Sequence, residues 1–454
     1  MTQSHLPFPV PVPNATIPFW RTNPHPLDTH RSTASLPQKT DILIIGAGYA
    51  GISTAYHLIT SSSSSPPPSI VLLEAREICS GATGRNGGHL RPSVPFPELI
   101  EKYGIAACLE IVLFEIAHMD AMKSLIEKEG IVCDFTLTGG HTVTKDPATV
   151  EFMKDVLGRY IAECPDLAED YTVVVGEEAE KQSGVKGVIG DWQHEVAHLW
   201  PYKLFAGLLE ICVKRGVNLQ TNTAVLKSGG RDEEGYWGFE TERGDVRAKK
   251  VVFATNGYTA GLLPEYKDVI APRKALCTHI VVKPSAEDGK VKRMGNGWDS
   301  TYIIEPPLGG FDYLIQRPDG GVVVGGANRT YKEDGSGLGD WDDSSMIKPA
   351  EGYFEGYLER YFSTFKKGED EETVDMAWTG IQGHTPDSLP HIGAVPGKEG
   401  QFIIAGFNGH GMPVIHLSSK GLVEMIVEGK KFEETRIPKL YEATKERLGV
   451  KFVL

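Results

Sequence analysis

The stretch Asp41–Gly51 constrains the fold more than any other part of the chain, because an apolar strand runs directly into closely spaced glycines. The strand is short, apolar and rich in β-branched residues, which predicts a buried parallel strand. Gly46, Gly48 and Gly51 then follow in the G-x-G-x-x-G spacing, and Ala50–Thr60 predicts a helix. Such glycines permit a tight turn, a close approach of backbone to a pyrophosphate and close helix–strand packing.

An acidic residue follows the next expected strand. Ser69–Leu73 is a second apolar run, and it ends in Glu74. A carboxylate at this position accepts hydrogen bonds from the ribose hydroxyls of an adenosine. Strand, glycines, helix, strand and acid together predict a Rossmann-type dinucleotide-binding unit. The alternative is a glycine-rich turn in another kind of α/β protein.

Composition excludes some classes of partner. The chain has 454 residues and a formal net charge of −14, which argues against nucleic acid as a partner. The six cysteines include no C-x-x-C pair, so we expect reduced thiols rather than a disulfide framework. No apolar run is long enough to span a bilayer, and the first residues lack the pattern of a secretory signal. We therefore expect a cytoplasmic protein with no membrane partner.

The order of the expected elements predicts two interleaved domains. An α/β pattern opens the chain, returns near residues 200–260 and closes it near 400–430, while strands of antiparallel character fill the gaps. Ser61–Pro68, rich in serine and proline, predicts a surface insertion. We assign residues 1–40 to an N-terminal arm, either docked or disordered. The remaining segments are 41–95, 196–270 and 375–454 for a dinucleotide domain, and 96–195 and 271–374 for a substrate domain.

Motifs spread over most of the chain resemble one known family. They are Gly46–Gly51, Glu74–Arg76, Ser80–Gly88, Trp200–Tyr202, Ala254–Gly257, Trp378–Gly380, Thr385–Asp387 and Gly406–Met412. In this order they resemble the FAD-dependent D-amino-acid oxidase, glycine oxidase and sarcosine oxidase superfamily, in its γ-glutamylputrescine oxidoreductase-like branch.

The resemblance implies an α/β fold, FAD as cofactor and an oxidative reaction. A Rossmann-type FAD domain would be joined to a substrate domain whose mixed or antiparallel sheet roofs the flavin ring. Members typically pass a hydride from the carbon next to nitrogen of an amine or amino-acid-like substrate to flavin N5. The imine is then hydrolysed, and oxygen often reoxidises the flavin, giving hydrogen peroxide.

The same resemblance assigns the residues that contact FAD. The expected set is Gly46, Gly48, Ala50, Gly51, Glu74, Ala75, Arg76, Gly81, Ala82, Thr83, Arg85, Asn86, Gly87, Gly88, Val225, Thr255, Asn256, Gly257, Gly380, Gly406, Asn408, Gly409, His410, Gly411 and Met412. Main-chain N–H groups before the last helix would face the flavin and stabilise negative charge on it.

Three residues are candidates for catalysis. His410 is the preferred base, because it lies in the flavin-facing motif, and His89 is the second choice. Arg85 would steady a phosphate or an anionic flavin. Each has a structural alternative, as a packed histidine or a structural arginine.

Substrate contacts are expected from the sheet that roofs the flavin. The candidates there are Tyr302, Tyr313, Gln316 and Arg317, and His384 is a further candidate, as a histidine that could touch substrate or flavin. An aromatic pair suits a cationic or apolar amine, whereas the alternative is that both rings belong to the core.

Departures from the family predict noncovalent FAD. Ala377 occupies the column where sarcosine oxidases keep a flavin-linking cysteine, and Arg85 stands where dimethylglycine dehydrogenases keep a linking histidine. Asp387 is interpreted as a buried turn-capping acid, and Lys274 as a surface lysine rather than a promoter of oxygen reactivity. No metal signature and no second dinucleotide fingerprint is evident.

Two other functions stay open. One is a flavin dehydrogenase of a 2-hydroxy acid, or an FAD oxidoreductase of specialised metabolism, that uses another acceptor. The other is a non-catalytic FAD-binding protein, against which the retained flavin-facing motifs argue.

Overall fold

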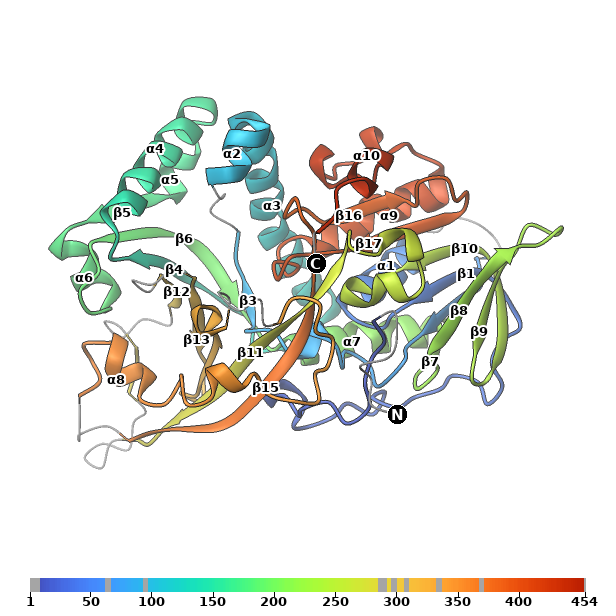
Figure 1. Cartoon of the computed structure of the whole chain (residues 1–454), viewed down its shortest axis with the longest axis horizontal. Helices are drawn as coiled ribbons and strands as arrows, with labels where there is room; N and C mark the ends of the chain where they lie inside the picture. Colours follow the sequence, from blue (N-terminus) through green and yellow to red (C-terminus); the bar gives the residue numbers. More distant parts are fainter. Residues whose placement is uncertain are drawn as a thin grey trace.

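The computed structural model describes residues 9–61, 67–92, 97–284, 292–294, 300–305, 310–331, 337–366 and 371–452. The centre of the serine- and proline-rich insertion, residues 62–66, lies outside these ranges. Two sheets stand side by side, the first on the right of Figure 1 and the second on the left.

The first sheet is mainly parallel, and its core is the predicted dinucleotide unit. Its strand order is β16-β17-β10-β1-β2-β7, with β1 parallel to both β10 and β2. An antiparallel pair, β8 and β9, extends it beside β10. The strands are β1 Lys39–Ile45, β2 Ile70–Leu73, β7 Asn218–Gln220, β8 Val225–Arg231, β9 Trp237–Thr241, β10 Gly244–Phe253, β16 His391–Ala394 and β17 Gln401–Ala405.

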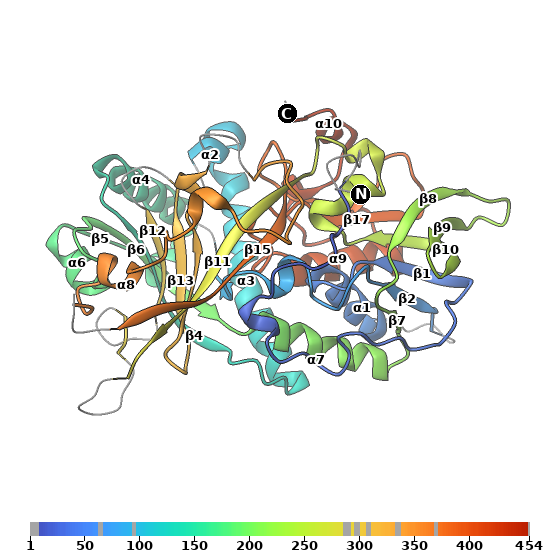
Figure 2. The ribbon, with the colours of Figure 1, turned by 60° about the horizontal axis from the view of Figure 1, so that its bottom comes forward.

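Both faces of this sheet are covered, which explains why its central strands are continuously apolar. Ile42 and Ile44 pack with the helices α1 Tyr49–Ser61, α7 Pro201–Lys214 and α9 Ile415–Glu428. Leu43 and Ile45, which alternate with them, pack into a separate core on the opposite face. Figure 2 shows α1 and α7 together below the strands.

The second sheet is mainly antiparallel and matches the predicted roof. Its order is β15-β11-β14-β13-β12-β4-β6-β3, with β5 beside β6, and the β12–β4 pair is parallel. The strands are β3 His89–Leu90, β4 Thr136–Thr144, β5 Thr172–Val175, β6 Gly190–His198, β11 Ala271–Val282, β12 Thr301–Glu305, β13 Asp312–Gln316, β14 Val322–Gly326 and β15 Glu372–His384.

Most of the remaining helices flank this second sheet (Figure 1). They are α2 Pro97–Tyr103, α3 Ile105–Glu129, α4 Pro147–Glu163, α5 Leu167–Asp170, α6 Glu177–Ser183 and α8 Tyr357–Tyr361, and α10 Lys445–Leu448 lies near the C-terminus. Short 3₁₀ turns connect the rest: Phe19–Arg21, Ala82–Gly84, Asn256–Gly261, Pro264–Tyr266, Asn328–Thr330, Lys348–Ala350, Phe432–Glu434 and Lys439–Tyr441. Among the described residues, no helix is long and apolar enough to cross a bilayer.

The N-terminal arm docks on the body along its described length. Trp20 is fully buried, and its indole N–H donates to the carbonyl of Asn86 over 2.5 Å. Ser32 N–H donates to the carbonyl of Leu219 in β7 over 2.8 Å. For residues 9–40 the structure therefore favours the docked alternative.

One strand of the second sheet, β15, spans the domain boundary expected at residue 375. β15 pairs with β11 in the second sheet along its whole length, although the predicted dinucleotide segment begins at residue 375. The assignment of segments to domains stays a prediction.

Candidate cofactor and active site

A cavity of about 620 Å³ opens at the carboxyl ends of β1, β2 and β10. Its walls come from the glycine turn after β1, the loop after β2, the segment after β10 and the turn before α9. Strands β11, β13 and β15 of the second sheet contribute Cys277, Tyr313 and Gly380. This is the crevice in which open parallel sheets bind ligands.

The glycine turn requires glycine for steric reasons. Gly46 has φ +106°, and a Cβ there would lie 2.6 Å from the carbonyl oxygen of Ala254. A Cβ on Gly51 would lie only 1.9 Å from the carbonyl oxygen of Gly46. Gly46, Gly48 and Ala50 line the cavity, whereas Gly51 supports the turn from behind by close packing. These are the separate roles expected of the three glycines.

Glu74 lines the cavity at the end of β2. Its carboxylate accepts hydrogen bonds from the N–H groups of Ala47 (2.8 Å) and Arg76 (3.0 Å). Burial raises the pKa of Glu74, and these two donors counteract that effect. A carboxylate oriented in this way has lone pairs left for ribose hydroxyls. Ala75, Arg76 and Val225 line the same part of the cavity.

The loop after β2 divides into lining and packing residues. Gly81, Ala82, Thr83, Arg85 and Asn86 line the cavity. Gly87 and Gly88 instead permit close packing on the second sheet, since a Cβ would lie 2.5 Å from the Tyr313 ring and 2.8 Å from Ile315, respectively.

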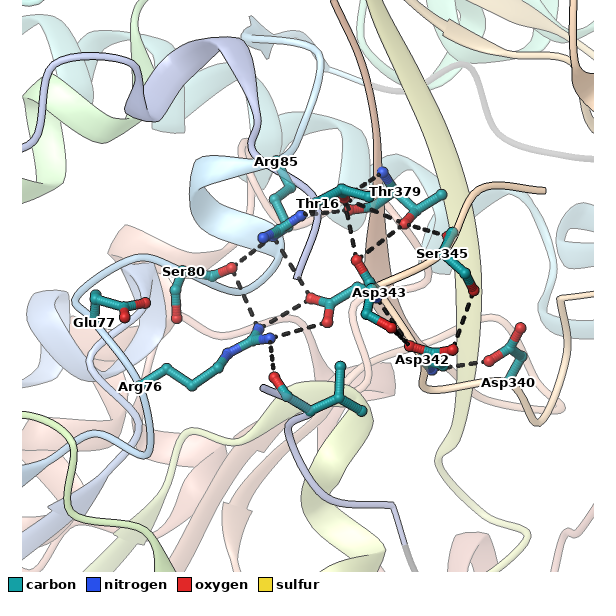
Figure 3. A network of polar contacts seen from close by, with 12 residues as sticks. Thr16, Arg76, Glu77, Ser80, Arg85, Asp340, Asp342, Asp343, Ser345 and Thr379 are labelled. Carbon is teal, nitrogen blue, oxygen red and sulfur yellow. Dashed lines mark hydrogen bonds and ion pairs between the residues drawn. The ribbon is translucent and has the colours of Figure 1, made fainter. Parts of the chain in front are cut away.

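The guanidinium of Arg85 is bound within the protein. It donates to the carbonyl of Ser80 (2.6 Å), the hydroxyl of Thr16 (3.0 Å) and the carbonyl of Thr379 (2.7 Å). Its Nε lies 3.6 Å from Asp343, which Figure 3 shows between Arg85 and Arg76. Burial lowers the pKa of Arg85 to about 10. This geometry favours the structural alternative for the Arg85 side chain.

The turn before α9 is held by side-chain amides. Asn256 Oδ1 accepts from the N–H of Gly406 (3.1 Å), and Asn408 Oδ1 accepts from that of Thr385 (2.8 Å). Gly409, Gly411 and Met412 line the cavity, as do Thr255 and Asn256. Gly406, Gly257 and Asn408 are not among the lining residues, so they shape the site from behind.

His410 is not among the cavity-lining residues either. Its Nε2 lies 3.0 Å from Oε2 of Glu115, a buried carboxylate of α3. Burial opposes protonation of His410, but the Glu115 carboxylate outweighs it, and the pKa of His410 is raised. The structure therefore pairs the preferred base with an acid that the sequence did not single out.

His89 lies behind the roof, with its ring 5.8 Å from that of Tyr313 and edge-on to it. Its Nε2 is buried with no hydrogen-bond partner. Burial lowers the pKa of His89 well below its usual value, so the imidazole is neutral at physiological pH. His89 does not line the cavity.

Only Tyr313 of the five expected substrate residues lines the cavity. Tyr302 pairs with Leu314, and Ile303 with Tyr313, so strand alternation turns Tyr302 and Gln316 to the opposite face of the sheet. Tyr302 stacks on His141 in the second core, and Gln316 bonds the backbone of Met294. The core alternative thus holds for Tyr302, and the structure does not bring the expected aromatic pair together.

The other two expected substrate residues are also engaged elsewhere. Arg317 pairs with Asp134 over 3.1 Å and packs over the rings of Phe19, Trp20 and Trp200. His384 bonds Gln382, which does line the cavity.

The structure also tests the interpretations of Asp387 and Lys274. Asp387 accepts from Leu389 N–H and pairs with Arg447, as expected of a buried turn-capping acid. Lys274 is not a surface lysine: it is 3% exposed and bonds Asp340 (3.2 Å) and Ser345 (2.8 Å). Lys274 pairs with Ile381 of β15 on one side, and its N–H donates to the carbonyl of Gly337 on the other, so the residue is covered from both sides. No cluster of metal ligands occurs among the described residues.

Several lining residues were missed by sequence reasoning. Cys277 and Gln382 extend the roof beside Tyr313, and Pro9, Val10 and Pro11 of the arm form part of the wall. Cys277 could have been found from the alternation of β11 once its pairing was known. The arm residues carry no sequence signal for this role.

The family model for DAO-type FAD-dependent oxidoreductases matches residues 41–425. The chain belongs to this family. Among curated proteins, the chain is similar to gamma-glutamylputrescine oxidoreductase of Escherichia coli, with 24% identity over 85% of this chain and 83% of the relative. It is also similar to glycine oxidase of Pseudomonas aeruginosa, with 21% identity over 85% and 94% of the two chains.

Solved structures agree in fold with this FAD-dependent oxidoreductase. Glycine oxidase from Geobacillus kaustophilus has a TM-score of 0.67 at 19% identity, covering 90% of this chain and 99% of that one. L-proline dehydrogenase from P. horikoshii has the same TM-score at 20% identity, over 92% and 100% of the chains. The glycine cradle and the backbone-held Glu74 fit the pyrophosphate and ribose of FAD, so the cavity suits the family's cofactor.

Proposed function

We propose that this FAD-dependent oxidoreductase is an oxidase of an amine or amino-acid-like substrate. The substrate loses two electrons and two protons at its C–N bond, giving an imine that water hydrolyses to a carbonyl compound. Oxygen takes up the electrons and protons and leaves as hydrogen peroxide. Bound FAD would supply the two-electron acceptor in the cavity.

The absence of free charge on the described part of the roof supports an amine as the substrate. The basic residues among those that line the cavity are Arg76 and Arg85, and both pair with Asp343. The roof itself presents Ala275, Cys277 and Tyr313, which are uncharged. A 2-hydroxy acid, like an amino acid with a free carboxylate, would need a cation for that carboxylate, so the uncharged roof favours an amine. Names of relatives, among them 4-methylaminobutanoate oxidase, also specify nitrogen-containing compounds.

Tyr313 is proposed to orient the substrate. Its hydroxyl lies 3.3 Å from the Cys277 thiol, and Gly87 and Gly325 leave room only for the flat ring between them. Burial raises the pKa of Tyr313 well above its usual value, so the hydroxyl stays protonated. A rigid, neutral hydroxyl can place the substrate carbon without binding it as an ion pair.

His410 and His89 stay proposed as proton acceptors. Neither lines the cavity, so either would act through a water molecule. His410 is the stronger base, because Glu115 stabilises its protonated form.

We further propose that FAD is held noncovalently. Ala377 is exposed on β15, outside the residues that line the cavity. Cys277 does line it, but burial raises the pKa of its thiol to about 12. The thiolate needed for attachment is therefore scarce at physiological pH.

Oxygen uptake tests the proposed function. The protein is mixed in air with polyamines, N-methyl amino acids, cyclic imino acids and 2-hydroxy acids, and oxygen and peroxide are measured together. We expect at least one nitrogen compound to consume oxygen with equal release of peroxide. If 2-hydroxy acids alone are oxidised, or dyes are reduced without oxygen uptake, the dehydrogenase alternative replaces this proposal.

A further inference from the structure

The N-terminal arm forms part of the wall of the cofactor cavity. Pro9, Val10 and Pro11 line it together with residues of the dinucleotide domain. The arm lies tightly against that domain, since a Cβ on Gly261 would be 2.5 Å from the carbonyl oxygen of Pro9. Val12, the next residue, is 1% exposed.

A buried ion pair fixes the arm beside the ribose-binding end of the cavity. Arg76 donates to the carbonyl of Val12 over 3.0 Å. The same guanidinium binds both oxygens of Asp343, at 2.9 and 3.0 Å (Figure 3). Asp343 is fully buried, so it cannot lose this partner without leaving an unpaired charge in the interior.

Thr16 joins the arm to the other side of this network. Its N–H donates to the carbonyl of Asp343 over 2.8 Å, and its hydroxyl accepts from Arg85 over 3.0 Å. The N–H of Thr379 in β15 donates to the same hydroxyl over 3.0 Å. One arm residue thus contacts the cofactor loop, the Asp343 segment and the roof (Figure 3).

Trp20 anchors the arm beyond this network. Its indole N–H donates to Asn86 of the cofactor loop, and its own carbonyl accepts from the indole of Trp200 over 2.7 Å. The arm therefore contributes Pro9–Pro11 to the cavity wall, and between Pro9 and Trp20 it is fixed at both ends and in the middle.

We propose that residues 9–20 are a strap that retains FAD, latched by Asp343 through Arg76, Arg85 and Thr16. This inference rests on FAD occupying the cavity. Release of the cofactor then requires the strap to detach, which breaks the contacts of Thr16 and the backbone bond from Arg76. FAD dissociation is slow as long as the latch is intact, and bound FAD in turn keeps the strap in place.

The test compares FAD dissociation from two threonine variants of the holoenzyme. Thr16→Val removes the acceptor used by Arg85 and Thr379 while preserving the shape of the side chain. Thr22→Val is the matched control, because Thr22 is exposed on the same arm and its hydroxyl donates to the carbonyl of Phe19. Free FAD is followed by its fluorescence after dilution. We expect Thr16→Val to release FAD about tenfold faster than the wild type, and Thr22→Val to match it.

Two further measurements test the strap without changing Thr16. Asp343→Asn is expected to release FAD faster than Asp340→Asn, its half-exposed neighbour that pairs with Lys274. Trypsin is expected to cut after Arg21, the residue that follows the strap, faster in FAD-stripped protein than in holoenzyme, because the strap is then free.

Equal dissociation rates for Thr16→Val, Thr22→Val and the wild type would overturn the strap. Equal tryptic cleavage with and without FAD would do the same. A wild-type protein that binds no FAD would instead refute the cofactor assignment itself, so the two failures are distinguishable.

Discussion

Replacing Gly51 by alanine is expected to reduce bound FAD at least tenfold. The added Cβ would lie 1.9 Å from the carbonyl oxygen of Gly46 and 3.3 Å from the side chain of Ile44. Both neighbours are fixed, one in the turn and the other in the central strand. Helix α1 would have to move away from the turn, and it packs against both α7 and α9. The backbone approach that the pyrophosphate needs is then lost.

The measurement is flavin per chain after acid precipitation. For the wild type we expect about one FAD per chain. Noncovalent binding, as proposed above, predicts that all of it stays in the supernatant. Gly158→Ala is the control, because it lies exposed in α4 with open space around its Cα. Normal FAD content in Gly51→Ala would contradict the assigned cradle, and yellow pellets would contradict noncovalent binding.

Mild acid is expected to destabilise the protein through a buried histidine cluster. His57, His118 and His416 lie between α1, α3 and α9, and Tyr49 bonds His118 over 3.1 Å. Burial lowers the pKa of His57 to about 4 and of His118 to about 3, and that of His416 also falls well below 6.5. All three are less than one-tenth exposed.

The direction in which stability changes with pH follows from the protonation of the unfolded chain. Unfolded histidines take up protons below pH 6.5, whereas the folded ones stay neutral until a much lower pH, so stability falls as pH falls from 6.5 toward 4. At about pH 5 each histidine costs about 2 kcal/mol, and the three together about 6 kcal/mol. That is a large part of a typical free energy of unfolding.

Thermal unfolding at pH 7.5 and pH 5 measures this effect. We expect a clearly lower melting temperature at pH 5, and a smaller drop for His57→Gln, which no longer titrates. His30→Gln, which changes a half-buried histidine of the arm outside the cluster, is the matched substitution control. An unchanged melting temperature between the two pH values would contradict the cluster's role.

Local sequence signals predicted the dinucleotide half well. The α/β pattern expected near residues 400–430 is present as β17 and α9, and the strand expected at the start of Asp41–Gly51 is present as β1. These elements are defined by short-range patterns: glycine spacing, apolar runs and helix periodicity. The residues they place at the cavity, such as Gly46 and Glu74, line it as expected.

The roof could not be predicted to the same degree, because its faces depend on strand register. Tyr302 and Tyr313 look equivalent in sequence, but their pairing with neighbouring strands puts them on opposite faces. Glu115 and Asp343 lie far in sequence from their partners His410 and Arg76, so no local pattern reveals them.

Anaerobic mixing of the purified protein with single substrates decides between an amine and a 2-hydroxy acid. We expect an amine to bleach the flavin absorbance, and the product of one turnover to be the carbonyl compound formed at the carbon next to nitrogen. The matching 2-hydroxy compound should leave the absorbance unchanged. Bleaching by the 2-hydroxy compound and by no amine would show that the protein is not an amine oxidase.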